Sequence, residues 1–367
     1  MYSILKKFLF TLEPETAHHF IKMAGKAAPK GLLSRITRVK DSVLKTSIDG
    51  VEISNPVGLA AGFDKNAEMA GFLFALGFGY LELGSVTNHP CAGSPRPRIF
   101  RLPKDESLMN RMGLPNVGVE RFAVNFSKIK ARIPCGINIA KNPFVGGNGS
   151  GMLQTARGIE EYVRTFVRVA PLGAYFVLNL SCPNTNDGKT FEDPKSFADL
   201  AREILLVRKD LHVAKPVLIK LSPDIDRKQL TALVEAAVKY GFEGFVVSNS
   251  TACHPHLKTS GDELKKIGRG GLTGKALHQA ANNQLKNVFD IVGRDKILIG
   301  VGGIMGIRDL LLKLSLGASL VQVYTGLVYR GPCFVRDLNR DLADFCRQQG
   351  VGNYIELRGL KEIASGL

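Results

Sequence analysis

The amino-acid sequence predicts a (β/α)8 barrel with a small helical extension at its N-terminus. Eight short apolar runs typical of buried strands alternate with amphipathic stretches typical of helices, a pattern that indicates a parallel sheet. The chain has 367 residues, a normal length for one barrel with an extension. Polar residues follow each run, as at the rim of a barrel. We expect the extension over residues 1–40 and the barrel over 41–367.

The predicted strands are 56–61, 79–84, 136–140, 175–180, 217–221, 244–247, 297–301 and 320–324. Amphipathic stretches between them include 159–169, 197–209 and 230–240. A doubly wound parallel sheet is the alternative architecture. Such a sheet usually carries a Gly-rich phosphate turn after its first strand, and none is found there. The barrel is therefore favoured.

The first 40 residues predict a short helical hairpin, because apolar residues recur at helical spacing, as at Ile4, Leu5 and Phe8. Eight Lys and Arg against two Glu make this segment basic. Two interpretations remain open. The hairpin could lie on a membrane surface with its cations toward lipid phosphates, or it could be a cap docked on the barrel. No apolar run of the sequence is long enough to cross a membrane.

The net charge of +16 fits nucleic acid, an anionic membrane or an anionic small molecule as partner. It also fits a general compositional bias, so charge alone decides nothing. The six cysteines are scattered and include no C-x-x-C pair, which argues against zinc, iron–sulfur clusters and a disulfide framework. We expect no metal site and a reducing compartment.

Polar residues at the ends of the predicted strands indicate a single site, because the C-terminal strand ends of a barrel meet at one rim. They are Asp64, Lys65, Ser85, Thr87, Asn138, Asn142, Lys220 and the segments 179–185, 248–251, 300–303 and 324–326. Gly302, Gly303 and Gly326 would let backbone N–H groups approach an anion, at the position where barrels commonly hold phosphate. The G-x-G pattern at 300–306 does not match a dinucleotide-binding turn in spacing or position.

The chemistry of the rim suits a heterocycle. Asn110, Asn138, Asn179, Asn184 and Asn249 offer donors and acceptors that match a pyrimidine or an isoalloxazine, although any one of them could simply form a turn.

Two further rim residues each have two interpretations. Lys220 stands inside an apolar strand and needs an anionic partner, either a flavin or a structural ion pair. Cys182 is either a small apolar residue or, on its polar loop, an acid–base group.

The sequence resembles dihydroorotate dehydrogenase over nearly its whole length, and specifically the membrane-associated, quinone-using branch. The matching blocks are LEPETAHHF (12–20), NPVGLAAGFDKN (55–66), PRIFRL (97–102), NRMGLPNVGV (110–119), GINIAKN (136–142), NLSCPNT (179–185), IKLSPD (219–224), SNST (248–251), GGLTG (270–274), IGVGGI (299–304) and GASLVQVYTGLVYRGP (317–332). Each block alone is weak, but the ordered set is highly specific.

The resemblance implies flavin mononucleotide (FMN) as cofactor and Cys182 as the catalytic base. The implied FMN-binding residues are Ala61, Gly62, Lys65, Ser85, Asn138, Asn179, Lys220, Ser248, Gly274, Gly303, Tyr324 and Thr325. The implied substrate-binding residues are Lys65, Asn110, Arg111, Met112, Gly113, Leu114, Asn179, Asn184, Asn249 and Ser250. His18 would face the quinone tunnel, with Arg101 at its inner end.

The implied reaction is oxidation of dihydroorotate to orotate in pyrimidine biosynthesis, with electrons passed to a membrane quinone. A base removes the proton at carbon 5 while hydride leaves carbon 6 for the flavin. The implied protein is a monomer that binds no nucleic acid and lies peripherally on the cytoplasmic side of a bacterial-type cell membrane.

Several positions depart from the quinone-using branch. That branch usually has serine at position 182, whereas cysteine is typical of the soluble branch, so a soluble acceptor such as fumarate is the alternative. Leu114 stands where an aromatic residue is expected, and Ser250 replaces a threonine. The Gly-rich segment 144–152 is longer than usual and has no assigned role.

Two further rivals are a tRNA dihydrouridine synthase and a flavin-free membrane adaptor. The synthase shares the flavin barrel and a cysteine after a similar Asn-containing run, and a charge of +16 would suit RNA. No C-terminal helical RNA-binding extension is recognisable, and Lys65 and Asn110 have no natural role in it. The adaptor is disfavoured because every expected site residue is present or conservatively replaced.

Overall fold

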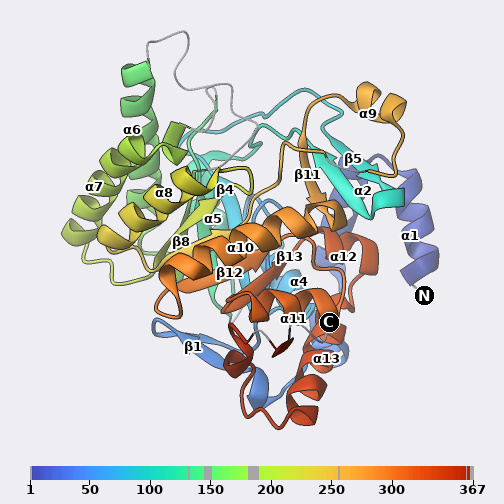
Figure 1. Cartoon of the computed structure of the whole chain (residues 1–367). Helices are drawn as coiled ribbons and strands as arrows, with labels where there is room; N and C mark the ends of the chain where they lie inside the picture. Colours follow the sequence, from blue (N-terminus) through green and yellow to red (C-terminus); the bar gives the residue numbers. More distant parts are fainter. Residues whose placement is uncertain are drawn as a thin grey trace.

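The structure is a computed structural model that describes residues 2–130, 133–143, 151–180, 190–254, 257–360 and 362–363. Eight parallel strands form a closed barrel in the order β10, β12, β13, β3, β4, β7, β8 and β9 (Figure 1). They are β3 (Val57–Leu59), β4 (Tyr80–Val86), β7 (Cys135–Ile139), β8 (Tyr175–Asn179), β9 (Val217–Leu221), β10 (Gly244–Val247), β12 (Ile297–Val301) and β13 (Leu320–Val323). The predicted fold class is confirmed.

Helices surround the barrel, so its strands are covered on both faces, which explains their continuous apolar runs. The surrounding helices are α4 (Ala70–Ala75), α5 (Gly118–Phe126), α6 (Gly151–Val169), α7 (Pro194–Asp210), α8 (Arg227–Lys239), α10 (His278–Val292), α11 (Ile307–Ser315) and α13 (Phe334–Gln348). The side chains of Asp193 and Asp226 cap the first turns of α7 and α8. The predicted stretches 159–169 and 197–209 lie within α6 and α7, and 230–240 extends one residue beyond the end of α8.

Two small antiparallel sheets were not predicted. β1 (Thr46–Ile48) pairs with β2 (Val51–Ile53) below the barrel, at the end where its strands begin (Figure 1). At the opposite end, β6 (Ser107–Asn110) lies between β5 (Ile99–Leu102) and β11 (Gly271–Gly274), and α9 (Gly261–Ile267) lies beside them. This second sheet covers part of the barrel mouth and so helps to enclose the site.

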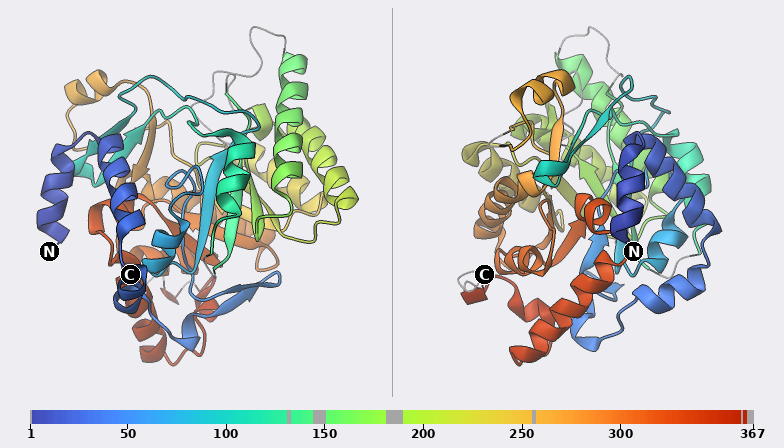
Figure 2. Two further views of the ribbon diagram at one scale, coloured as in Figure 1. Left: turned by 180° about the vertical axis from the view of Figure 1, so that it is seen from behind. Right: turned by 90° about the vertical axis from the view of Figure 1, so that its right-hand side faces the viewer.

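The N-terminal segment forms three helices, α1 (Tyr2–Thr11), α2 (Pro14–Ala27) and α3 (Lys30–Thr37), one more than the expected hairpin. They lie on the outside of the barrel (Figure 2). α1 docks on α12 (Thr325–Arg330), where the Tyr2 hydroxyl donates to the Val328 carbonyl at 2.6 Å. Phe10 meets the ring of Tyr329 edge-on, with centroids 5.4 Å apart. No helix in the described part of the chain is long and apolar enough to cross a membrane.

Two arginines, Arg98 just before β5 and Arg101 within it, join the N-terminal helices to this strand. Arg98 forms an ion pair with Glu15 of α2, at 3.0 Å from Nε and 2.9 Å from Nη2 to the same carboxylate oxygen. Both side chains are largely buried, with 9% and 12% exposed. Arg101 donates to the carbonyls of Leu9 and Leu12 at 3.2 and 2.7 Å. A cation at the end of α1 is also favoured by the helix dipole.

We predict that Arg98→Ala lowers the free energy of unfolding by about 3 kcal/mol, because the nearly buried Glu15 then keeps only the exposed Arg96 as a cationic partner. Arg96→Ala is the matched control. Arg96 approaches the same Glu15 at 3.5 Å but is 70% exposed, so its loss should cost less than about 1 kcal/mol. Urea unfolding of the three proteins measures both values, and equal losses would contradict a role for burial.

Candidate active site

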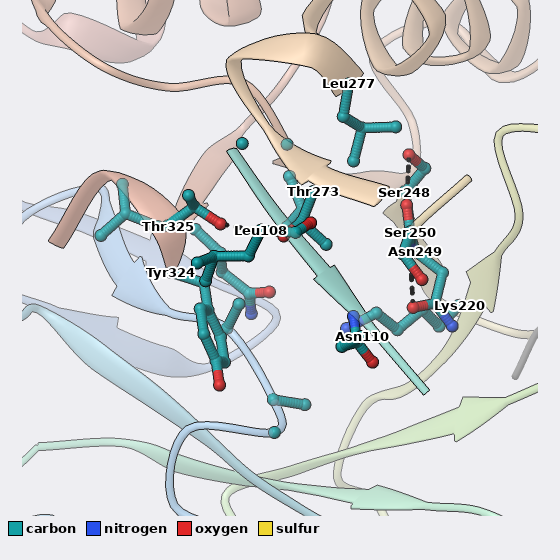
Figure 3. Close-up of a pocket in the computed structure, with 18 of the residues that line it drawn as sticks. Leu108, Asn110, Lys220, Ser248, Asn249, Ser250, Thr273, Leu277, Tyr324 and Thr325 are labelled. Carbon is teal, nitrogen blue, oxygen red and sulfur yellow. Dashed lines mark hydrogen bonds between the residues drawn. The ribbon is translucent and has the colours of Figure 1, made fainter. Parts of the chain in front are cut away.

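A pocket lies at the C-terminal end of the barrel, beneath the sheet of β5, β6 and β11. It holds about 1200 Å³ of empty space, with the solvent at its mouth included. Figure 3 shows Tyr324 and Thr325 on one side of it and Lys220, Ser248, Asn249 and Ser250 on the other. Leu108 and Asn110 stand on β6, which crosses between them. Residues far apart in the sequence, from Ala60 to Gly326, therefore converge here.

Most of the predicted site residues line this pocket. They are Ala61, Gly62, Lys65, Ser85, Asn110, Met112, Leu114, Asn179, Lys220, Ser248, Asn249, Ser250, Gly274, Gly303, Tyr324 and Thr325.

Three of the residues predicted to bind the cofactor or the substrate lie elsewhere. Asn138 lies below the pocket, where it contacts Ser85, and Gly113 lies against Ser94. The guanidinium of Arg111 lies over the Phe100 ring, 4.7 Å from its centroid. Cys182, Asn184 and most of the Gly-rich segment lie outside the described residues.

A buried carboxylate, Glu82 of β4, organises the floor of the pocket. It is fully buried inside the barrel. Its oxygens accept from Asn138 Nδ2 at 2.7 Å, from Gln322 Nε2 at 2.7 Å and from Lys220 Nζ at 3.3 Å. Lys220 therefore forms the structural ion pair that was one of its two interpretations, and it also lines the pocket.

The amide side chains form one network above Glu82. Asn249 Nδ2 donates to Asn179 Oδ1 at 3.2 Å, and Asn179 Nδ2 donates to the Ser85 hydroxyl at 3.2 Å. That hydroxyl donates in turn to Asn138 Oδ1. A chain of hydrogen bonds fixes the orientation of each amide, so the donors and acceptors that face the pocket are preorganised.

Lys65 brings a positive charge to the pocket wall. Within the described part of the chain its ammonium donates no hydrogen bond and forms no ion pair. Burial, with a smaller contribution from Arg98, lowers the pKa of Lys65 to about 8. The neighbouring Asp64 fixes the loop, because its carboxylate accepts from the amides of Glu68 and Met69 at 2.9 and 2.7 Å. A cation held in this way suits an anionic ligand.

The Gly-rich end of the pocket suits a phosphate. Gly302 and Gly303 adopt φ of +102° and +80°, and among the described residues their amides donate no hydrogen bond. A Cβ on Gly303 would lie 2.5 Å from the Cα of His278, so no side chain fits there. The first turn of α12, which begins at Thr325, adds N–H groups without helical partners.

A second pocket lies between α2 and the barrel. It is lined by His18 and Arg101, the two residues predicted for the quinone tunnel. It shares Lys65 and Tyr324, among others, with the first pocket. The Phe63 ring stands between His18 and Tyr324, with centroids 5.0 and 5.3 Å away. The two pockets are therefore adjacent.

Burial, aided by the charges of Lys65 and Lys22, lowers the pKa of His18 to about 4. The imidazole is consequently neutral near pH 7, and it can both donate and accept a hydrogen bond. Burial also raises the pKa of Tyr324 to about 12, so this hydroxyl stays protonated.

Sequence reasoning missed Glu82, Gln322 and Phe63. Glu82 and Gln322 are polar residues inside apolar strands, as is Lys220, so the same signal could have found them. Phe63 carried no such signal, because an aromatic residue after a strand is unexceptional.

Comparison with known proteins decides the family. The model of the family described as "Dihydroorotate dehydrogenase" matches residues 43–346. The chain belongs to the dihydroorotate dehydrogenase family. A relative from Corynebacterium efficiens named "Dihydroorotate dehydrogenase (quinone)" is 36% identical over 98% of this chain and 93% of its own length. A relative of the same name from Mycobacterium tuberculosis is 34% identical over 98% of both chains.

Solved structures of dihydroorotate dehydrogenase agree with this assignment. The crystal structure of DHODH in complex with ferulenol from Eimeria tenella superposes with a TM-score of 0.85 at 26% identity. The superposition covers 95% of this chain and 96% of the Eimeria tenella chain. The ligand-free form from the same organism gives a TM-score of 0.83 at 27% identity.

We predict that Glu82→Ala lowers the free energy of unfolding by about 3–5 kcal/mol, because the ammonium of Lys220 and two amide donors lose their acceptor in the barrel interior. The control is Glu106→Ala, which breaks partly exposed pairs with Lys275 and Arg330 and should cost less than about 1 kcal/mol. Denaturant unfolding tests both. A loss below 1 kcal/mol for Glu82→Ala would show that the network is not needed for stability.

Proposed function

We propose that this protein oxidises dihydroorotate to orotate with FMN bound in the first pocket, and that a membrane quinone in the second pocket accepts the electrons. The observation that carries the proposal is the pair of adjacent pockets that meet at Phe63 and Tyr324. The first pocket has the donor set of a heterocycle site, and the second pocket opens beneath the N-terminal helices. The quinone-using relatives support the same acceptor.

The residues around the first pocket fit FMN. The free amides of Gly302 and Gly303 and the start of α12 would hold the phosphate, while Ser85 and Asn179 would bond the ring system. Lys220, anchored by Glu82, would place a positive charge near the ring. When bound, FMN would accept the hydride from carbon 6 of the substrate.

The substrate would lie beside Lys65. Its carboxylate would pair with this ammonium, which has no other ion-pair partner among the described residues. Asn110, Asn249 and Ser250 would bond the polar groups of the pyrimidine ring, since all three line the pocket. These contacts hold carbon 5 and carbon 6 in a fixed position relative to the cofactor, which is the main contribution of such binding residues.

Cys182 is proposed as the base that removes the proton at carbon 5. It follows β8, whose last residue, Asn179, lines the pocket. A thiolate at this position would accept the proton, and its reactivity would depend on its ionised fraction. A soluble acceptor such as fumarate is the second candidate, because the branch resembled by the N-terminal helices usually has serine here.

Residues 1–40 are proposed as a membrane and quinone-site extension, and residues 41–367 as the FMN barrel. Large apolar side chains of α1 are open to solvent, with Ile4 75% and Phe8 56% exposed. Such side chains on a basic segment suit a membrane surface. We propose a monomer that associates peripherally with the cytoplasmic side of the membrane.

The proposal is tested by mixing the flavin-loaded protein anaerobically with dihydroorotate and then with a short-chain ubiquinone, while the flavin absorbance is followed. Bleaching by dihydroorotate followed by rapid recovery on quinone is the expected result. Recovery with fumarate but not with quinone would replace the acceptor. The absence of bleaching in flavin-loaded protein would contradict the oxidation itself.

We predict that Cys182→Ala keeps its flavin but slows flavin reduction by dihydroorotate by about 10²–10⁴-fold, the usual contribution of a general base. Cys182→Ser is the matched variant, because it keeps a group that can take the proton, and it should retain more activity than alanine. Stopped-flow absorbance measures the reduction step directly. Full-rate reduction of the alanine variant would rule out the assignment.

We predict that orotate binding weakens above about pH 8. The Lys65 ammonium is present below its pKa of about 8 and is lost as the pH rises through that value, so the dissociation constant should increase about tenfold per unit above it. Lys65→Arg keeps the charge, so its affinity should stay flat between pH 7 and about 9. Flavin-fluorescence titration with orotate provides the comparison. Parallel profiles would remove Lys65 from the carboxylate site.

A further inference from the structure

A third hollow lies on the outer surface, between the N-terminal helices and the barrel helices α4 and α5. We call it the basic groove and define it by its five cations, Lys26, Lys30, Arg121, Lys128 and Lys130. It holds about 1440 Å³ of empty space, with open solvent included. The left view of Figure 2 shows the blue N-terminal helices and the teal α5 on the side that faces the viewer.

The charge of the basic groove is unbalanced. Within the described chain none of its five cations forms an ion pair, and all five side chains are exposed. Among the described residues Glu68 is the one carboxylate that lines the groove, and its Oε2 forms an ion pair with Lys22 Nζ at 2.5 Å. Like charges that converge on a hollow create a positive potential that attracts an anion. The groove therefore offers several donors to a phosphate.

The floor of the basic groove is apolar and open. Ala67, Ala70 and Ala75 line it with small, buried side chains. A Cβ on Gly71 would meet only the Lys30 side chain, at 3.8 Å, and a Cβ on Gly31 would meet nothing within 4 Å. Cations at the rim above an apolar floor match a ligand that joins a phosphate to an apolar body.

The helices beside the groove also expose large apolar side chains. Phe20 and Met23 of α2 are 49% and 54% exposed, and Leu32 and Ile36 of α3 are 59% and 53% exposed. These side chains have no role in the pockets described above. Exposed apolar side chains on a basic helical segment are typical of a surface that lies at the lipid headgroup level.

We propose that the basic groove binds the phosphate headgroup of an anionic phospholipid. Two of its cations belong to the N-terminal helices, and three belong to α5 and the segment that follows it in the barrel. The barrel itself would then contact the membrane, which sets the orientation of the whole molecule. This inference rests on the proposed membrane association and adds a defined lipid site to it.

The test uses the flavin-loaded full chain and a triple variant, Arg121→Glu, Lys128→Glu and Lys130→Glu. All three positions are on the barrel side, so the N-terminal helices stay unchanged. The matched control reverses three exposed cations on α7 and α8, Lys209→Glu, Lys228→Glu and Lys239→Glu, which gives the same change of net charge. Co-sedimentation with phosphatidylcholine vesicles, with and without phosphatidylglycerol, measures binding.

We expect the groove variant to bind phosphatidylglycerol-containing vesicles at least about 100-fold more weakly than the wild type, since each lost cation near an anionic surface weakens binding severalfold. The control variant should bind within about threefold of the wild type. Binding to pure phosphatidylcholine should be equally weak for all three proteins. Wild-type affinity of the groove variant, or an equal loss in the control, would overturn the proposal.

Two readouts separate this inference from its alternatives. Flavin reduction by dihydroorotate in detergent should be unchanged in the groove variant, so failure of the proposed function would be seen in the wild type first. Calorimetric titration with inorganic phosphate tests for a soluble ligand. Phosphate binding that the variant loses, together with unchanged vesicle binding, would assign the groove to a soluble phosphate compound and overturn the lipid site.

Discussion

The buried charge of Glu82 at the centre of the barrel determines how the polar side chains at the floor of the pocket are oriented. A fully buried carboxylate is costly unless donors surround it, and here Asn138, Gln322 and Lys220 each donate to it. These three donors come from three different strands of the barrel, so the ion cluster also fixes how the strands sit around the axis. Because Asn138 is committed to Glu82, it orients the Ser85 hydroxyl above it. The orientation of the amide and hydroxyl groups that line the pocket thus depends on one buried charge.

The N-terminal helices have a structural role that follows from the same electrostatics. The ion pair of Glu15 with Arg98 and the bonds of Arg101 to the end of α1 hold α1 and α2 against β5 on the outside of the barrel. This position creates the second pocket and brings His18 within contact of Phe63. It also leaves Lys65 close to Arg98, which contributes to its lowered pKa. The two interpretations of this segment, a docked cap and a membrane hairpin, are therefore compatible, since one face of the helices packs on the barrel and another is exposed.

Local sequence pattern predicted the strands that are buried on both faces. The runs at 217–221, 244–247 and 297–301 match β9, β10 and β12 residue for residue, because each is mainly apolar, apart from Lys220, and is followed by serine or glycine residues. The sheet over the mouth could not be predicted in this way. It pairs Asn110 with Gly271, and nothing in either short segment indicates a partner so distant in the sequence. The same limit applies to single side chains such as Arg111, which lies over the Phe100 ring and donates to the Ile267 carbonyl.

The topology of the barrel bears on the choice of electron acceptor. In the strand order, β8 lies four places from β13, so the two strands are on opposite sides of the closed barrel. The segment with Cys182 follows β8, whereas the second pocket lies beside Phe63, which follows β3, and Tyr324, which follows β13. On the proposed assignment, a base that follows β8 and an acceptor bound beside β3 and β13 would approach from opposite sides of the barrel. The identity of the base therefore does not determine the identity of the acceptor. A cysteine at position 182 is compatible with a quinone beneath the N-terminal helices.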